Sequence, residues 1–351
     1  MKRGLFVLGV AVAALASCTN EEVVEVAQNR AIKFDSFVNN NTRAVVSGEL
    51  NSQSDLTSKF FVFGKYDASE TGSFTGEAFN NDNGDRQVAW VDQQYYRFAA
   101  YADGNAGAPI TDANVTYDVA KQTLTFNNYV PDDKKDLVAA TAKTGLISTS
   151  ATQIDKVPLK FQHMLSQVKF TFQTKIDADY TLAISDIKVN AIKTGKGVYQ
   201  PSETSAPIKW EAATAGQTED YAFGAITDLA TPVTGGQGYS TSAVSLYVIP
   251  QSNADLEVTF TVKLHGLSIT EENAKTANLK AKLAYDPADT SGNKGIKDYW
   301  TPGFKYNYTA TIDMADISDD LKIIEFAPSV DNWTDAEDET PDVEDNTTVT
   351  P

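Results

Sequence analysis

The chain has very few of the residues that carry catalytic and redox chemistry. Its 351 residues include one cysteine, two histidines and three methionines. A single cysteine, Cys18, excludes an intramolecular disulfide. His163 and His265 have no partner at metal-ligand spacing, and the HExxH, CxxC, GxSxG and glycine-rich phosphate-binding motifs are missing from the sequence. We therefore expect no catalytic residue, no metal and no cofactor, and His163 is expected to tie a turn through a side-chain hydrogen bond.

Basic residues are also scarce. Lys and Arg number 29 against 47 Asp and Glu, which gives a net charge of -18. A surface this acidic repels phosphate backbones, so nucleic acid is not an expected partner. The hydrophobic content of 42% is normal for a folded protein, and the length favours two domains over one small core.

The N-terminus has the pattern of an export signal. Two basic residues precede an apolar stretch, 5–15, that is too short to span a bilayer. The stretch ends in "LASC" (15–18), where small residues precede the only cysteine, as in a bacterial lipobox. We expect residues 1–17 to be a lipoprotein signal peptide and Cys18 to be lipidated, which would anchor the precursor in the outer membrane. The alternative is a plain signal peptide cleaved near Ala16.

No segment shows a 3.6-residue apolar period of helical length. Short runs rich in Val, Thr, Tyr and Phe instead alternate with turn residues at intervals of ~8–12 residues. In "VPLKFQHMLSQVKFTFQTKI" (157–176), Val168, Phe170 and Phe172 occupy one side of the expected strand. This pattern predicts an all-β fold of two antiparallel β-sandwich domains in tandem, divided at the Ser/Thr-rich link 145–153.

A lone basic residue follows the first strand pattern. The run "AIKFDSFV" (31–38) is a short apolar strand, and "NNNTR" after it ends at Arg43. Apolar sequence resumes at Val45. Arg43 is either an ordinary loop residue in a chain that stays whole or a cleavage site, since an asparagine-rich loop is open to a protease.

Four phrases, in this order, resemble the fimbrillin family of Bacteroidales, the subunits of type V pili. They are "PLKFQHMLSQVKFTF" (158–172), "LYVIPQ" (246–251), "WTPGFKYNYTATI" (300–312) and "IIEFAPSVDNW" (323–333). Together with the lipobox and Arg43, the resemblance covers most of the chain. It implies transthyretin-like, Greek-key sandwiches, export as an outer-membrane lipoprotein, maturation by an Arg-specific protease and assembly by strand exchange.

Placed on this sequence, the resemblance assigns the cut to the bond between Arg43 and Ala44, with Arg30 as a less favoured site. The cut would remove a first strand whose apolar residues leave a groove for a strand of another subunit. These residues are Ile32, Phe34, Phe37 and Val38. The expected parts of the chain are the signal peptide 1–17, a propeptide 18–43, sandwiches 44–150 and 151–333, and an acidic flexible tail 334–351.

The incoming strand has one candidate in this sequence, the segment 321–333. Its apolar residues are Ile323, Ile324, Phe326, Val330 and Trp333. The same segment is equally suited to close the second sandwich of its own chain. The acidic extension after Trp333 departs from an ending at an apolar donor strand, so stalk, tip and anchor positions all remain open.

Three functions compete at this level. The first is a subunit or tip adhesin of a surface fimbria, with other pilus subunits, a maturation protease, the outer membrane and a host or bacterial surface ligand as partners. The second is a lipoprotein that binds glycans and does not polymerise, using exposed tryptophans. The tryptophans are Trp90, Trp210, Trp300 and Trp333, and we favour a core role for them. The third is a lipid-anchored hydrolase with paired carboxylates, for which no pair stands out.

Overall fold

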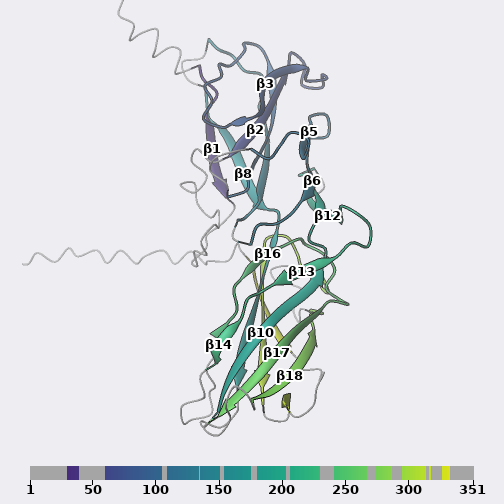
Figure 1. Cartoon of the computed structure of the whole chain (residues 1–351). Coiled ribbons are helices and arrows are strands. Elements are labelled where there is room, and N and C mark those ends of the chain that lie inside the picture. The colour runs from purple at the N-terminus through teal and green to yellow at the C-terminus, as the bar shows by residue number, and fades with distance from the viewer. Residues whose placement is uncertain are drawn as a thin grey trace, which may run out of the picture.

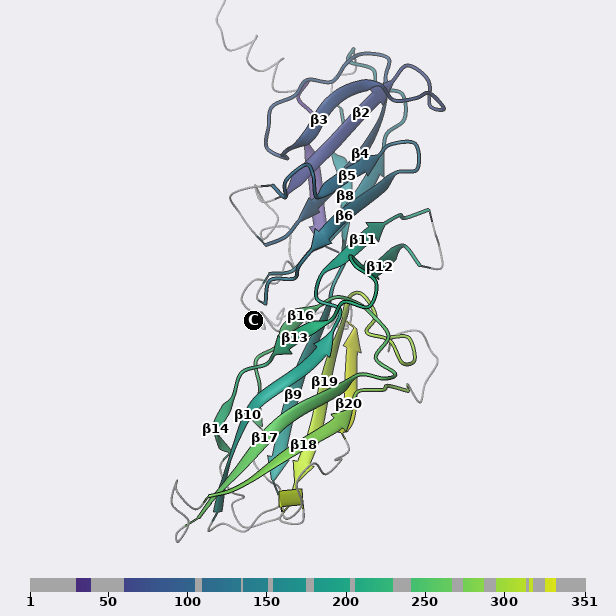
Figure 2. The same cartoon turned by 45° about the vertical axis from the view of Figure 1, so that its right-hand side comes forward.

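The structure, a computed structural model, consists of strands. It describes residues 30–38, 60–104, 109–133, 135–150, 154–174, 180–202, 206–229, 241–266, 274–286, 295–313, 316–317 and 326–332. The named elements run from β1 to β20 and confirm the predicted all-β class. Figures 1 and 2 show two bodies placed end to end along one long axis. Within the described ranges, no helix has the length and apolarity to cross a membrane.

The first body is built from a six-stranded and a four-stranded sheet. The larger sheet has the order β1 (Phe34–Val38), β8 (Val157–His163), β7 (Val138–Lys143), β4 (Tyr95–Ala102), β2 (Phe61–Asp67), β3 (Gly76–Asn83). The smaller sheet has the order β12 (Ile208–Ala212), β11 (Gly195–Tyr199), β6 (Thr123–Tyr129), β5 (Val115–Asp118). Phe63 and Tyr101 of the larger sheet share a buried cluster with Phe126 and Trp210 of the smaller one, so the two sheets pack face to face.

The second body pairs two five-stranded sheets. One has the order β13 (Glu219–Ala222), β10 (Tyr180–Ala191), β17 (Glu257–Gly266), β18 (Lys275–Lys282), with β14 (Ile226–Leu229) also on β10. The other has the order β15 (Thr241–Ser242), β9 (Ser166–Thr174), β19 (Phe304–Ile312), β20 (Phe326–Asn332), with β16 (Leu246–Val248) also on β9. Val168, Phe170 and Phe172 are all fully buried between these sheets, as the alternation in the sequence predicts.

The sheets differ from the sequence-based expectation in two respects. Strand pairing crosses the expected division at 150/151, because β8, β11 and β12 follow residue 150 and pair within the sheets of the first body. The hairpin β11–β12 reaches back to pair with β6, and this long-range pairing leaves no local signal. Antiparallel pairing also fails at two places, since β1–β8 and β9–β19 run parallel.

The six-stranded sheet curls until its two outer strands meet. Phe34 of β1 and Phe79 of β3, at opposite ends of the sheet order, have ring centroids 5.6 Å apart. Gly64 of β2 permits this curl, because a Cβ there would lie 2.9 Å from the rings of both Phe79 and Phe98. The curl encloses a second core on the outer face of the sheet. This core includes Ile32, Phe60, Val62, Phe79, Trp90, Tyr96, Phe98, Val157, Leu159 and Phe161.

Buried tyrosines make the fold sensitive to alkali. Burial raises the pKa of Tyr96, Tyr199 and Tyr306 to about 12, whereas an unfolded tyrosine ionises near pH ~10. The native state therefore holds these protons more tightly than the unfolded state, and its stability is full below about pH 10. We expect the free energy of unfolding to fall as pH rises from about 10 to about 12. Urea unfolding at about pH 8 and about pH 11 measures the effect, and an unchanged midpoint would contradict it.

Candidate functional site

The strand β1 lies along the outer edge of β8 (Figure 1). The pairing is parallel and runs from Phe34 opposite Val157 to Val38 opposite Phe161. The stretch before β1 is also held, because Ile32 donates its N–H to the Val88 carbonyl at 2.7 Å and Trp90 donates to the Arg30 carbonyl at 2.9 Å. Residues 30–38 thus cover the outer edge of β8. They also meet β3 at the place where the curled sheet brings its two outer strands together.

The side chains of this stretch are part of the core. Ile32 is 3% exposed, and Phe34 is partly buried. The ring of Phe34 packs edge to face on Phe60, Phe79 and Phe98, with centroids 5.7, 5.6 and 5.4 Å away. Such pairs add to the gain from burial itself. Two of the four predicted strand residues therefore point into the core, whereas the side chains of Phe37 and Val38 lie outside what the structure describes.

The surface beneath the strand is apolar. Val157, Leu159 and Phe161 of β8 are at most 2% exposed and face the same core as Phe34. If residues 30–38 left, these side chains and the hydrogen-bonding edge of β8 would meet water. We call this edge, with the core surface that Ile32 and Phe34 cover, the β1 site. It has the properties of a groove that receives an extended apolar strand.

Truncating Phe34 measures how strongly β1 holds the uncut chain together. Phe34→Ala is expected to lower the free energy of unfolding by roughly 3 kcal/mol, the lower end for a buried phenylalanine, because the ring is only partly buried. Val244→Ala is the control, since Val244 is 54% exposed and its truncation should change stability by less than ~0.5 kcal/mol. Equal effects of the two changes in urea unfolding would contradict a core role for Phe34.

The structure describes residues 326–332 of the candidate donor segment 321–333. Phe326–Asn332 forms β20, which pairs antiparallel with β19 at the edge of its own sheet. Phe326 packs against the core of the second body, and Val330 is buried. In this chain the segment thus closes its own sandwich, the second of the two roles that the sequence allowed. Cys18, Arg43, Ala44, Ile323, Ile324 and Trp333 lie outside the described residues.

His163 ends β8 and makes a buried polar contact. Its Nδ1 lies 2.6 Å from Oδ2 of Asp136, and both side chains are almost inaccessible to water. Asp136 precedes β7, and the Met164 N–H next to His163 donates to the Leu137 carbonyl at 2.8 Å. The pair therefore ties the start of β7 to the end of β8, the structural role expected for His163.

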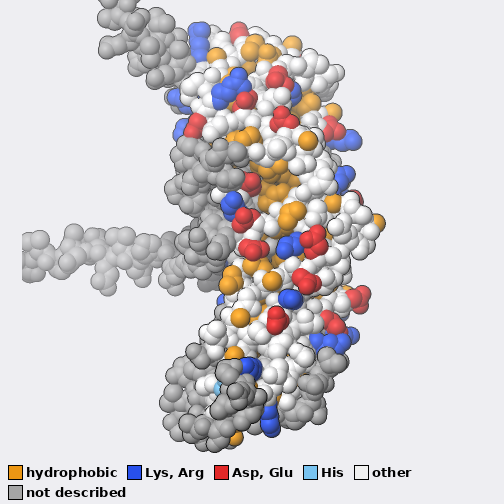
Figure 3. All heavy atoms as spheres, in the orientation of Figure 1, with side chains coloured by type: hydrophobic (Ala, Val, Ile, Leu, Met, Phe, Trp, Pro, Cys, Tyr) orange, Lys and Arg blue, Asp and Glu red, His pale blue; other side chains and the backbone are white. Residues whose placement is uncertain are grey.

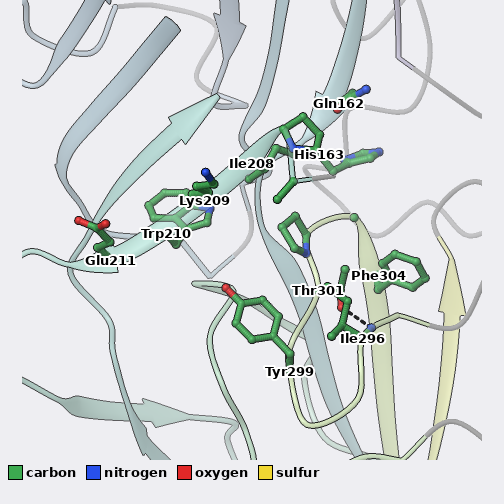
Figure 4. A pocket seen from close by; sticks show the side chains of 14 residues that line it. Gln162, His163, Ile208, Lys209, Trp210, Glu211, Ile296, Tyr299, Thr301 and Phe304 are labelled. Carbon is green, nitrogen blue, oxygen red and sulfur yellow. Dashed lines mark hydrogen bonds between the residues drawn. The ribbon is translucent and has the colours of Figure 1, made fainter. Parts of the chain in front are cut away.

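A pocket lies where the two bodies meet (Figure 4). Three segments form its walls. They are the end of β8 (162–163), the stretch 206–211 that leads into β12, and the loop around 296–304 that leads into β19. The volume is about 560 Å³. We call it the junction pocket. Sequence reasoning missed it because its three walls come from distant segments and share no motif.

The described residues support neither metal binding nor sugar stacking by three of the tryptophans. Among the described residues, no group of three or more His, Cys, Asp or Glu side chains is placed to hold a metal ion. Trp90, Trp210 and Trp300 are at most 9% exposed, which confirms the preference for core packing over sugar stacking for these three. Figure 3 shows acidic and basic side chains interspersed over the visible face, and hydrophobic side chains gathered in the middle of it, between the positions of β8 and β12 in Figure 1.

Comparison with known proteins identifies the family. The model of the fimbrillin-like family matches residues 30–333. Among solved structures, a fimbrial protein from Bacteroides vulgatus has 18% identity and a TM-score of 0.51, covering 87% of this chain and 100% of that one. The fimbrial anchor protein Mfa2 from Porphyromonas gingivalis has 11% identity and a TM-score of 0.35, covering 86% and 98%. No curated protein sequence matches the chain. Since the family match spans most of the sequence, this protein belongs to the fimbrillin-like family.

Proposed function

We propose that the protein is a structural subunit or tip adhesin of a cell-surface fimbria and serves adhesion. It is exported as a lipoprotein through Cys18, cut after Arg43 and joined to its neighbours by strand exchange at the β1 site. The same cut frees the subunit from the lipid anchor, because Cys18 and β1 are on the removed side. A catalytic role is not part of the proposal.

The observation that carries this proposal is the position of β1. It is the first strand, it lies at a sheet edge, and it fills a core with Ile32 and Phe34. Burial of two such side chains is worth roughly 3–6 kcal/mol before entropy costs. Arg43 follows the end of the strand by a few residues. A cut there severs the strand from the rest of its domain, and β1 is the one element on the removed side that the structure describes.

A strand of matching chemistry is present in the same chain, where it pairs with β19 and would have to leave this strand to enter a neighbour. β1 belongs to the sequence "IKFDSFV" (32–38), and β20 belongs to "IEFAPSV" (324–330). Both read I-x-F-x-x-x-V, so Ile324, Phe326 and Val330 repeat the spacing of Ile32, Phe34 and Val38. This repetition supports the C-terminal segment of a second copy as the incoming strand, by the β-strand addition seen in donor-strand complexes.

Polymerisation of purified protein tests the proposal. The full-length chain is treated with an Arg-specific protease and run on a gel after mild heating in SDS. We expect a mature chain that begins at Ala44 by mass spectrometry, together with a ladder of resistant oligomers. A cut chain that stays monomeric and binds glycans would instead favour the glycan-binding lipoprotein.

A further inference from the structure

The junction pocket lies directly ahead of a strand that occupies the β1 site. Val38 is opposite Phe161, and the next two residues of β8, Gln162 and His163, line the pocket. An extended strand rises ~3.3 Å per residue, so three further residues span ~10 Å. A strand that follows the direction of β1 therefore reaches the pocket within about three residues of its last pairing with β8.

The edge strand β12 forms one wall of the pocket, next to the end of β8. Trp210 of β12 donates its indole N–H to the Met164 carbonyl just past β8, at 2.7 Å, so β12 is the strand of the smaller sheet next to β8. In the described part of the chain, β12 pairs with β11 alone and is an edge strand. Consecutive residues 206–211 line the pocket, which means that this edge forms its wall.

The lining suits an aromatic side chain. Ile208, Ile296, Tyr299, Pro302 and Phe304 give it an apolar wall, and Figure 4 shows Ile296, Tyr299 and Phe304 around it. Ile296 is 60% exposed, the largest exposure among the large hydrophobic residues that the structure describes. An exposed apolar side chain that lines an apolar pocket is open to contact with an apolar group of a partner.

The C-terminal segment supplies an aromatic residue at the required spacing. With Val330 in the place of Val38, the third residue beyond is Trp333. Residues 334–351 contain no other aromatic residue. The third residue beyond Val38 is Asn41. The severed segment therefore has no aromatic residue at this position, whereas the incoming C-terminal segment has Trp333.

We propose that the junction pocket of one subunit binds Trp333 of a second copy whose segment 324–330 has replaced β1. The inference rests on the proposed function and adds a selectivity site to it. Trp333 would fix the register of the inserted segment, because a slip by one residue moves every side chain to the other face. It would also favour the incoming segment over the severed one, since only the former carries an aromatic anchor.

Peptide binding to the cut protein tests the pocket. The full-length protein is cut after Arg43, and a labelled peptide of residues 322–334 is titrated against it beside the same peptide with Trp333→Ala. We expect the tryptophan peptide to bind at least about 30-fold more tightly, as for an aromatic hot spot. Ile296→Asp in the acceptor should remove this difference, and Val244→Asp, an exposed change outside the pocket lining, should keep it.

The outcomes separate the two proposals. Equal binding of both peptides would overturn the role of the pocket while strand replacement stands. Failure of both peptides to bind would overturn the proposed function and the pocket inference together.

A cysteine cross-link tests whether the tryptophan comes from a second copy. Asn332 of the same chain is opposite Phe304, a pocket residue, so Trp333 of the same chain is the competing occupant. After the cut the protein has no natural cysteine, because Cys18 is removed. In polymers of an Ile296→Cys/Thr334→Cys variant, we expect disulfide-linked ladders on non-reducing gels. A cross-link confined to single chains, or none, would overturn the proposal.

Discussion

Arg43→Ala is expected to abolish the SDS-resistant ladders that protease treatment produces from the wild-type chain. Without the cut, β1 stays covalently attached to its own domain and competes for the β1 site at a very high effective concentration. An incoming strand with similar apolar residues cannot displace it at ordinary protein concentrations. The lipid proposed at Cys18 would also stay attached, so cell-surface protein carrying Arg43→Ala should remain with the membrane fraction.

Arg30→Ala provides the matched control. Arg30 is exposed but lies in a stretch whose backbone is bonded to the domain, with its carbonyl accepting from Trp90. A cut after Arg30 would leave β1 joined to the chain that follows it, so this site does not open the groove. We expect Arg30→Ala to polymerise like the wild type. Ladders of normal intensity from Arg43→Ala, by quantitative gel densitometry, would refute activation by this cut.

His163→Ala is expected to lower the free energy of unfolding by about 3–5 kcal/mol. The change leaves the Asp136 carboxyl group buried with its 2.6 Å partner removed. A buried acidic group that loses its partner keeps the cost of desolvation without the hydrogen bond that offset it, so the penalty exceeds the value of an ordinary hydrogen bond. Urea unfolding of the uncut chain measures the loss.

The other histidine serves as the control for this change. His265 is partly exposed on β17, and His265→Ala should cost far less than His163→Ala. A double variant with His163→Leu and Asp136→Leu should lose less stability than the sum of the two single changes, because neither partner is then left alone. Additive losses would show that the two side chains do not act as a pair.

The sequence predicts local features of this fold well and long-range ones poorly. The alternation at Val168, Phe170 and Phe172 predicts their burial, because a strand with one face in a core must alternate. The parallel pairing of β1 with β8 has no such local mark, since residues 34 and 157 meet only through the folded sheet. The pairing of the hairpin β11–β12 with β6, across the boundary expected at 150/151, lacks a local mark for the same reason.

The same contrast holds at the candidate site. The sequence pattern predicts that Ile32 and Phe34 lie on a strand. Because a lone arginine follows that strand, the sequence also suggests that the strand can be cut away. The contact of Phe34 with Phe79 follows from the curl of the sheet, which no short window contains. The junction pocket requires β8, β12 and the loop before β19 to converge. Its chemistry therefore becomes visible only once the chain is folded.

The direct passage from β8 into β9 has a mechanical consequence. Only Met164 and Leu165 separate the two strands, and both are fully buried. In the proposed polymer, β8 would pair with the strand of the neighbouring subunit. The chain of β8 continues directly into β9, which lies beside β19 inside a sheet of the second body. Tension along the fibre would then be transmitted along continuous backbone and would load the ladder on β8 in shear, with its hydrogen bonds sharing the force at once. A joint of this kind resists pulling far better than one peeled open bond by bond.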